Sequence, residues 1–92
     1  MKEQQLETHL CWAIRRIGGI CWKFTSPGLT GVPDRICMMD GKCVFVEVKT
    51  TGKQPRPLQI ARMKELQRQG FTCIVLDHPD EIQEVCDALQ AA

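Results

Sequence analysis

One dipeptide, Asp40-Gly41, most constrains how this chain of 92 residues can fold. It lies between two apolar, alternating runs, and this arrangement is a strong signal for a two-residue β-hairpin. With the dipeptide at the tip, the numbers of every facing pair of residues sum to 81. Asp34 and Glu47 obey this relation, so their carboxylates should face each other on one side of the sheet, with Cβ atoms about 4.5–5.5 Å apart. Lys49, two residues beyond Glu47, should point to that same side.

Hydrophobic periodicity predicts the remaining elements. Helices are expected over residues 3–17 and 57–69 and from residue 79 onward, and strands over residues 20–25, 34–39, 43–50 and 71–76. Pro57 suits the first position of its helix, and Gly70 suits the residue just after it. The predicted order is αβββαβα in a single α/β domain spanning residues 1–92, with a mixed central sheet flanked by helices. The strands over 43–50 and 71–76 should be parallel, because a helix connects them.

Composition excludes several classes of protein. The chain has no apolar run of 18 residues and no signal-peptide core, so we expect a soluble, cytoplasmic protein without a membrane segment. Its six cysteines form no C-x-x-C motif and lack zinc-like spacing, so we expect reduced thiols that pack as small hydrophobes, with no zinc site or disulfide framework. A domain this small often gains stability by oligomerisation, which makes a homodimer plausible.

Charge is distributed unevenly although the net charge is only +1. Residues 49–68 contain six basic side chains against one acidic, a local charge of +5, whereas residues 77–87 contain five acids and no Lys or Arg, a local charge of −5. Two solvated helix faces would explain this pattern. The basic stretch, however, directly follows the carboxylate hairpin, where a phosphate backbone would lie if the site acts on nucleic acid.

The facing carboxylates predict a metal site. Asp34 and Glu47 would bind Mg²⁺ or Mn²⁺ through oxygen, the ligand type that these cations prefer, and the backbone carbonyl of Val48 could add a further ligand. The metal would activate a water molecule for attack on a phosphodiester. Lys49 would orient or deprotonate that nucleophile and offset developing negative charge.

Two further polar residues have two interpretations each. Gln59 lies on the apolar stripe of its predicted helix, beside Met63, where it could bond a ligand water or a phosphate, or could be a satisfied boundary amide. Glu7 borders the apolar face of the first helix, where it could act as an outer metal carboxylate, or could be an exposed first-turn acid favoured by the helix dipole.

Candidate DNA contacts flank the carboxylates along the chain. They are Lys23, Ser26, Gly31, Lys53, Arg56 and Arg62. Gly31 would permit a turn with positive φ or a close approach of the substrate backbone. Solvated side chains remain the alternative for Lys23 and Ser26. We interpret Trp12 and Trp22 as core or interface anchors rather than base-stacking platforms.

The ordered set of these residues resembles a known superfamily. It comprises Glu7, Gly31-Val32-Pro33-Asp34, Glu47-Val48-Lys49 and Gln59. In this order the residues are similar to the PD-(D/E)xK nucleases, and within them to the stand-alone VRR-NUC (virus-type replication–repair nuclease) domains of phages and bacteria. The resemblance implies a restriction-endonuclease-like core and metal-dependent hydrolysis of DNA, with Asp34 and Glu47 as ligands and Lys49 as the catalytic lysine.

The resemblance also suggests an assembly. Small members of the family look like homodimers similar to Holliday-junction resolvases, so we expect a homodimeric, Mg²⁺- or Mn²⁺-dependent endonuclease that cuts four-way junctions or related branched DNA. After the lysine, this chain carries Thr50-Thr51-Gly52-Lys53 where many members have a Gly-rich, partly acidic segment, which leaves the substrate geometry open. The alternatives are a monomeric flap or duplex nuclease or nickase, and a DNA-binding module that has lost the chemistry.

Overall fold

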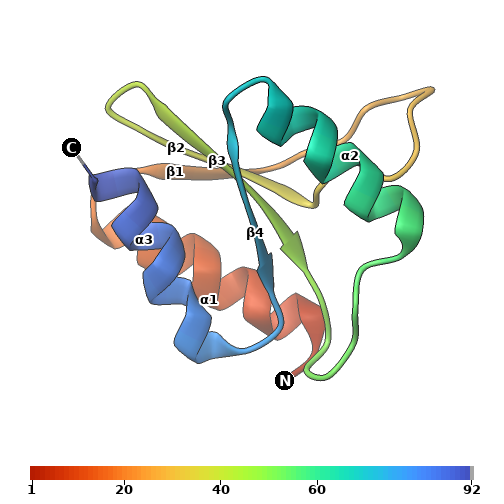
Figure 1. The fold of residues 1–92 in the computed structure, drawn as a ribbon. Coiled ribbons are helices and arrows are strands. Elements are labelled where there is room, and N and C mark those ends of the chain that lie inside the picture. The colour runs from red at the N-terminus through yellow and green to blue at the C-terminus, as the bar shows by residue number, and fades with distance from the viewer. Residues whose placement is uncertain (92) are drawn as a thin grey trace.

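The fold of residues 1–91 was described from a computed structural model (Figure 1). Its elements, in chain order, are α1 (Glu3–Arg16), β1 (Ile20–Lys23), β2 (Arg35–Met39), β3 (Lys42–Val48), α2 (Pro57–Arg68), β4 (Thr72–Leu76), the short 3-10 helix η1 (Pro79–Glu81) and α3 (Ile82–Gln90). The predicted order αβββαβα is confirmed, with one refinement. The last helix begins as a 3-10 turn at Pro79 and becomes α-helical from Ile82.

The four strands form one mixed sheet in the order β1-β2-β3-β4. The pairs β1/β2 and β2/β3 are antiparallel, whereas β3/β4 is parallel, as the intervening helix predicts. The hairpin register runs from Met39 opposite Lys42 to Arg35 opposite Val46, so the predicted register is confirmed. Asp40 and Gly41 both have positive φ, 50° and 81°, the conformation that a tight type I′ hairpin turn requires.

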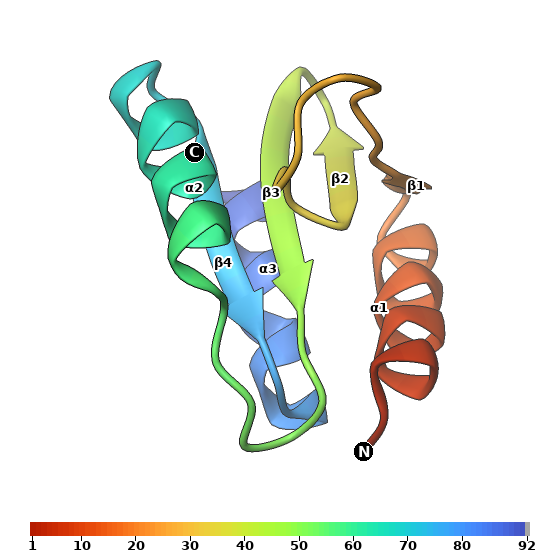
Figure 2. The ribbon, with the colours of Figure 1, turned by 90° about the vertical axis from the view of Figure 1, so that its right-hand side faces the viewer.

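Helices cover the two faces of the sheet unequally. Figure 2 shows α2 in front of β4 and α3 behind the sheet, while no helix lies in front of β2. The main core fills the face that meets α1 and α3. It contains Leu6, Leu10 and Ile14 of α1, Val44, Val46 and Val48 of β3, and Val85, Cys86 and Leu89 of α3. The alternating side chains of β3, which include Glu47 and Lys49, therefore point to the α2 side.

The cysteines lie within or beside this core. Cys37 and Cys86 are buried, and the other four are half-buried free thiols. The Sγ atom of Cys21 lies 3.3 Å from that of Cys11 and 3.6 Å from that of Cys37, so three thiols from α1, β1 and β2 meet. Burial, then the thiol contact with Cys21, raises the pKa of Cys11 to about 11, which keeps this thiol protonated at neutral pH. None of the helices formed by residues 1–91 is long and apolar enough to cross a membrane.

The burial pattern of α1 gives a stability prediction. Leu10 is fully buried, whereas Thr8 on the same helix is exposed. We expect Leu10→Ala to destabilise the domain by about 2–5 kcal/mol, because it removes transfer free energy and leaves a cavity, and Thr8→Ala to change stability by less than about 0.5 kcal/mol. Urea unfolding followed by circular dichroism measures both. Equal midpoints for the two variants would contradict this assignment of the core.

Candidate active site

Asp34 and Glu47 come together at the open end of the hairpin. The β2–β3 ladder ends with Arg35 opposite Val46, and the next facing pair in that register is Asp34 and Glu47. The backbone N–H of Val48 donates a hydrogen bond of 2.8 Å to Oδ2 of Asp34, which fastens this carboxylate to the end of β3. This side-chain hydrogen bond uses the N–H of Val48 that would otherwise continue the backbone ladder between β2 and β3. Strand β2 therefore begins at Arg35 and not at residue 34, where the sequence predicted its start.

Glu47 is the most unusual side chain of the site. It is 1% exposed, and its Oε1 has no hydrogen-bond partner among the described residues. The ammonium Nζ of Lys49 lies 3.0 Å from Oε2 as an ion pair, and the Lys49 side chain is itself only 14% exposed. A buried carboxylate with unfilled lone pairs is costly unless a cation or further donors compensate it. The donor set of Asp34 and Glu47 therefore fits a hard divalent cation, whose preferred ligand is oxygen.

Burial dominates the acid–base properties of both carboxyl groups. Desolvation raises the pKa of Glu47, the Lys49 ammonium opposes this shift, and the charge of Asp34 reinforces it. Desolvation also raises the pKa of Asp34, while the hydrogen bond from Val48 lowers it and the charges of Glu7 and Glu3 raise it. A bound cation would reverse these shifts, because it favours the ionised carboxylates.

Glu7 lies close enough to influence Asp34 but has its own partner. Its Oε1 accepts a 2.9 Å hydrogen bond from Nε of Arg35, in an ion pair whose side chains are 17% and 19% exposed. Arg35 follows Asp34 directly and points to the α1 side of the sheet, so the pair joins α1 to the start of β2. Among the described residues, no group of three His, Cys, Asp or Glu side chains is arranged to hold a metal ion. Further ligands for a cation at Asp34 and Glu47 would thus be backbone carbonyls, such as that of Val48, or water.

Gln59 is buried in the first turn of α2, on the helix that covers the Glu47 side of the sheet. Its side-chain Oε1 accepts a 2.8 Å hydrogen bond from the backbone N–H of Arg56, which caps the helix. The oxygen of the Gln59 amide therefore has a hydrogen-bond partner, as the interpretation of Gln59 as a boundary amide expects. A role in bonding a ligand water or a phosphate would have to use the Nε2 group.

The loop between β1 and β2 is held against α2. Gly31 has a φ of +92°, and a Cβ atom there would lie 2.9 Å from Cγ of Leu58. The guanidinium of Arg62 donates through Nε to the carbonyl of Thr30 at 3.0 Å and pairs with Glu65 at 2.6 Å. In this structure Arg62 therefore fastens the loop to the helix, and Gly31 permits close packing between them.

The other basic candidates lie at different distances from the carboxylates. Lys53 and Arg56 are exposed on the connection that leaves β3 just after Lys49. Lys23 pairs with Arg35 in the sheet and points to the α1 side, opposite to Glu47, so the structure does not bring it to the carboxylates. Ser26 is half-buried in the loop, where its backbone carbonyl accepts from the N–H of Leu29.

Comparison with known proteins gives the family. A scan against protein-family profiles finds no match. The chain is 44% identical over 81 residues to "Putative nuclease p44" of Acyrthosiphon pisum secondary endosymbiont phage 1, covering 87% of each protein. Two solved structures, described as "VRR_NUC domain" and "VRR_NUC domain protein", superpose with TM-scores of 0.86 and 0.73 at 22% and 21% identity. The superposed regions include 95% and 100% of this chain, and 96% and 91% of the two solved structures. The chain belongs to the VRR-NUC nuclease family.

Two charged residues of this VRR-NUC site escape sequence reasoning. Glu3 is one helical turn before Glu7, and its charge raises the pKa of both Asp34 and Glu47. The spacing of four residues between Glu3 and Glu7, which puts both on one helix face, is the signal that could have identified it. Arg35 has no comparable signal, because its pairing with Glu7 joins residues 28 positions apart in the chain.

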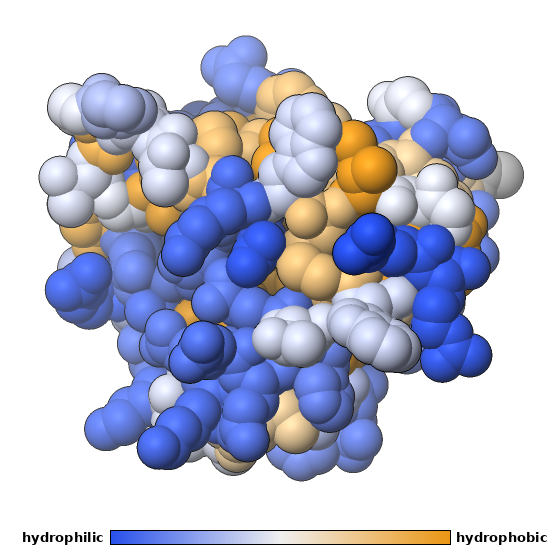
Figure 3. Space-filling model, turned by 180° about the vertical axis from the view of Figure 1, so that it is seen from behind, coloured by the Kyte–Doolittle hydropathy of each residue, from blue (hydrophilic) through white to orange (hydrophobic). Residues whose placement is uncertain are grey.

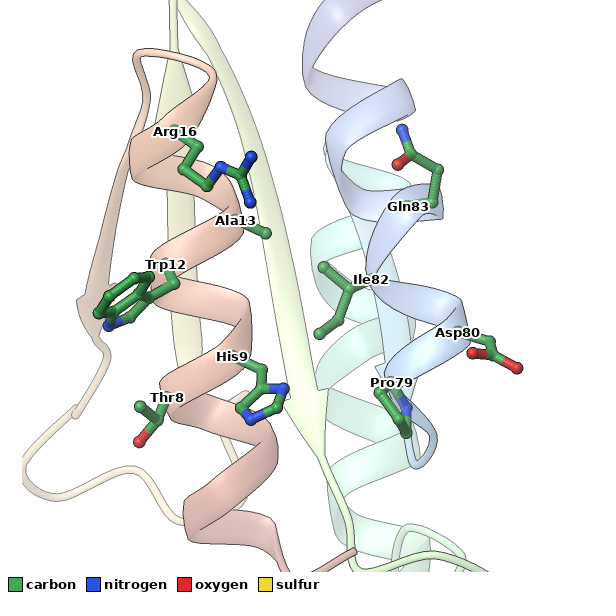
Figure 4. A pocket seen from close by; sticks show the side chains of 9 residues that line it. All are labelled: Thr8, His9, Trp12, Ala13, Arg16, Pro79, Asp80, Ile82 and Gln83. Carbon is green, nitrogen blue, oxygen red and sulfur yellow. The ribbon is translucent and has the colours of Figure 1, made fainter.

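The two tryptophans, interpreted as core or interface anchors, are not core residues, and their role at an interface stays a prediction. Trp12 is 69% exposed on α1, and Trp22 is 60% exposed on β1. Trp12 lines a groove of about 660 Å³ between α1 and the η1–α3 segment, with Arg16 on one wall and Asp80 on the other (Figure 4). This groove contains none of the carboxylates of the VRR-NUC site and lies on the opposite side of the sheet from Glu47.

The burial of Glu47 makes a prediction about pH. A carboxyl group whose pKa is raised on folding binds its proton more tightly in the folded state, so wild-type stability falls as pH rises from about 4.3, the unfolded value, through the folded pKa. We therefore expect Glu47→Gln to raise the melting temperature by a few degrees at pH 8 in EDTA, and the gain to vanish near pH 4. Exposed Glu84→Gln is the control and should show no such difference. A destabilised Glu47→Gln at pH 8 would contradict the assigned burial cost.

Proposed function

We propose that this VRR-NUC domain is a metal-dependent DNA endonuclease that hydrolyses phosphodiester bonds at Asp34, Glu47 and Lys49. One observation supports the proposal most strongly: the Glu47 carboxylate is buried at the open end of the hairpin, and among the described residues only the Lys49 ammonium pairs with it. A fold selected for stability alone gains little from such a pair, because the desolvation of two buried charges can exceed their mutual attraction. The relative named for nuclease activity supports the same conclusion.

The proposed roles follow from position. Asp34 and Glu47 would hold Mg²⁺ or Mn²⁺, with the Val48 carbonyl as a further ligand and Glu7 as an outer carboxylate. Such a cation supplies Lewis acidity that stabilises negative charge on the reacting phosphoryl group. Lys49, whose Nζ is held 3.0 Å from Glu47, would orient the attacking water and offset the charge that develops on the phosphate. Gln59 would position a water or a phosphate oxygen through its amide nitrogen.

The DNA backbone would approach from the α2 side. Lys53 and Arg56 are exposed directly after β3, so they are placed to contact phosphates beside the carboxylates. Gly31 and Arg62 would contribute by shaping the loop at the edge of the site, and Ser26 by contacting phosphate from that loop. Lys23 points to the other side of the sheet and could contact only DNA that wraps around the β1 edge.

A homodimer acting on branched DNA is the finer proposal. A domain of 92 residues has a small core, and two copies related by a twofold axis could cut both strands of a symmetric four-way junction. We expect native mass spectrometry at micromolar concentration to give twice the monomer mass of 10.4 kDa. A single-chain mass at all concentrations would favour the monomeric flap or duplex nuclease. The protein would act inside a phage-infected or bacterial cell.

The decisive experiment is cleavage of a matched panel. Purified protein is incubated with a four-way junction, a flap, a continuous duplex and a single strand, each with Mg²⁺, with Mn²⁺ and with EDTA. We expect metal-dependent cutting, with Asp34→Asn and Lys49→Met each lowering kcat/KM by at least about 100-fold, because each removes a group that acts on the transition state. Cutting of flap or duplex alone would retain the nuclease and exclude the resolvase.

A binding control separates loss of metal from loss of chemistry. Mn²⁺ should raise the melting temperature of the wild type and of Lys49→Met, because a ligand that binds only the folded state stabilises it. Asp34→Asn and Glu47→Gln should lose this shift, whereas exposed Glu84→Gln should keep it. If the wild type binds DNA but never cuts it in either metal, the catalytic proposal is wrong and the DNA-binding module replaces it.

A further inference from the structure

The exposed indole of Trp22 lies on the same side of the sheet as the carboxylates. Its neighbour Cys21 points to the α1 side, where its Sγ atom contacts those of Cys11 and Cys37, so Trp22 must point the other way. Phe24, the residue that directly follows β1, lies two residues beyond Trp22 and agrees with this orientation. Its ring centroid is 5.4 Å from that of Phe45, which alternates with the core-facing valines of β3 and points to the α2 side.

The strand register places Trp22 beside Asp34. The β1–β2 pairs run from Ile20 opposite Met38 to Lys23 opposite Arg35. The next pair in that register is Phe24 and Asp34, and the backbone N–H of Phe24 donates to the carbonyl of Asp34 at 2.8 Å. Trp22 is therefore the diagonal cross-strand neighbour of Asp34 on one face of the sheet. Such neighbours are about 7–8 Å apart, within reach of a large aromatic side chain.

No helix of the described fold covers this part of the face, although the loop between β1 and β2 crosses the same side of the sheet to reach α2. Helix α2 packs against β4 and leaves β1 and β2 without a helix on that side (Figure 2). Trp22 is 60% exposed and Ile20, on the same face, is 42% exposed, while Ile36 opposite Trp22 is half-buried. The side of the molecule that carries β1 shows apolar residues gathered in its upper half and polar residues below (Figure 3). An indole this exposed contributes little to the core, so its large flat surface is available to a ligand.

The position of Trp22 favours a nucleobase as that ligand. A protein partner centred on Trp22 would lie beside its diagonal neighbour Asp34 and would crowd the phosphate that the proposed function requires there. A base attached to a nucleotide beside that phosphate would instead occupy the Trp22 surface while its backbone remained at the carboxylates. Aromatic side chains on an open sheet face are effective stacking surfaces, because every base has a π-face.

We propose that Trp22 stacks on an unpaired base of the DNA substrate next to the cleaved phosphate, and so favours branch points, flaps and single strands over continuous duplex. The inference rests on the proposed nuclease function and specifies its substrate class. Bases within a continuous duplex are already stacked on their neighbours, and extracting one requires unstacking and unpairing. Bases at a branch or in a flap are free to move onto the indole.

The test measures binding without cleavage, in EDTA or with Ca²⁺ in place of Mg²⁺. In a Trp12→Phe background Trp22 is the only tryptophan, so its fluorescence reports directly on stacking. We expect a flap or single-stranded oligonucleotide to quench this fluorescence and an unbranched duplex of equal length to quench it far less. The reciprocal variant, Trp22→Phe with Trp12 retained, should show little quenching, because Trp12 lies on the other side of the sheet.

Affinity provides the second readout. Trp22→Ala should weaken binding of the flap about 5- to 100-fold, the range typical for loss of one stacked base, with a smaller loss on duplex. Trp22→Phe should restore most of the affinity, since a smaller ring can still stack. Trp12 is another largely exposed tryptophan and lies outside the site, so Trp12→Ala is the matched control and should bind as the wild type does.

Several outcomes would overturn the inference. Unchanged flap affinity in Trp22→Ala, or an equal loss on flap and duplex, would show that Trp22 does not read unpaired bases. A wild-type dimer that becomes monomeric in Trp22→Ala would make Trp22 an interface residue instead. Failure of the nuclease function is distinguishable, because quenching and selective flap affinity could persist in a protein that cuts no DNA.

Discussion

The positive φ angles of Asp40 and Gly41 are the constraint on which the site depends. They close a hairpin of two residues, and a hairpin of this kind leaves no freedom in register. A slip of one residue would turn Glu47 toward the α1 core and all three core valines of β3 toward the opposite face. The register that buries Val44, Val46 and Val48 is thus the same register that faces Glu47 toward Asp34.

The site is maintained at the expense of stability. Glu47 is 1% exposed, its Oε1 lacks a hydrogen-bond partner among residues 1–91, and Asp34 is held close to it by the N–H of Val48. Two carboxyl groups whose pKa values are both raised by burial oppose folding in their ionised forms. Lys49 offsets part of this unfavourable free energy through its ion pair with Glu47. The Lys49 side chain is itself largely buried. The Lys49 charge lowers the pKa of both carboxyl groups and the Asp34 charge raises that of Glu47, so substitution of Lys49 or Asp34 changes the protonation of Glu47.

Local signals in the sequence were sufficient for most of the fold and for the pair of carboxylates. The turn dipeptide, alternation along β3, Pro57 at the start of α2 and Gly70 after its end each act over a few residues, and they determined the element order and the hairpin register. Contacts between residues far apart in the chain could not be predicted from these local signals. The Glu7–Arg35 ion pair joins α1 to β2, and its geometry depends on how α1 crosses the sheet, which no spacing in the chain encodes. The exposure of Trp22 also depends on a tertiary fact, that α2 covers β4 and not β1.

Unequal coverage of the sheet connects the fold with its chemistry. The α1 and α3 side is packed with aliphatic residues and supplies most of the buried apolar surface. The α2 side holds Glu47 and Lys49 at its buried end and Trp22 at its open end, with Asp34 between them. In the proposed function a backbone phosphate would bind at the charged part of this face, and an unpaired base would stack on the aromatic part. These two parts of the face are neighbours in the sheet. Because Asp34 adjoins both, a second helix covering β1 and β2 would stabilise the sheet but would close the route to the carboxylates. Leaving half of one sheet face without a helix thus limits the apolar surface that this small domain can bury.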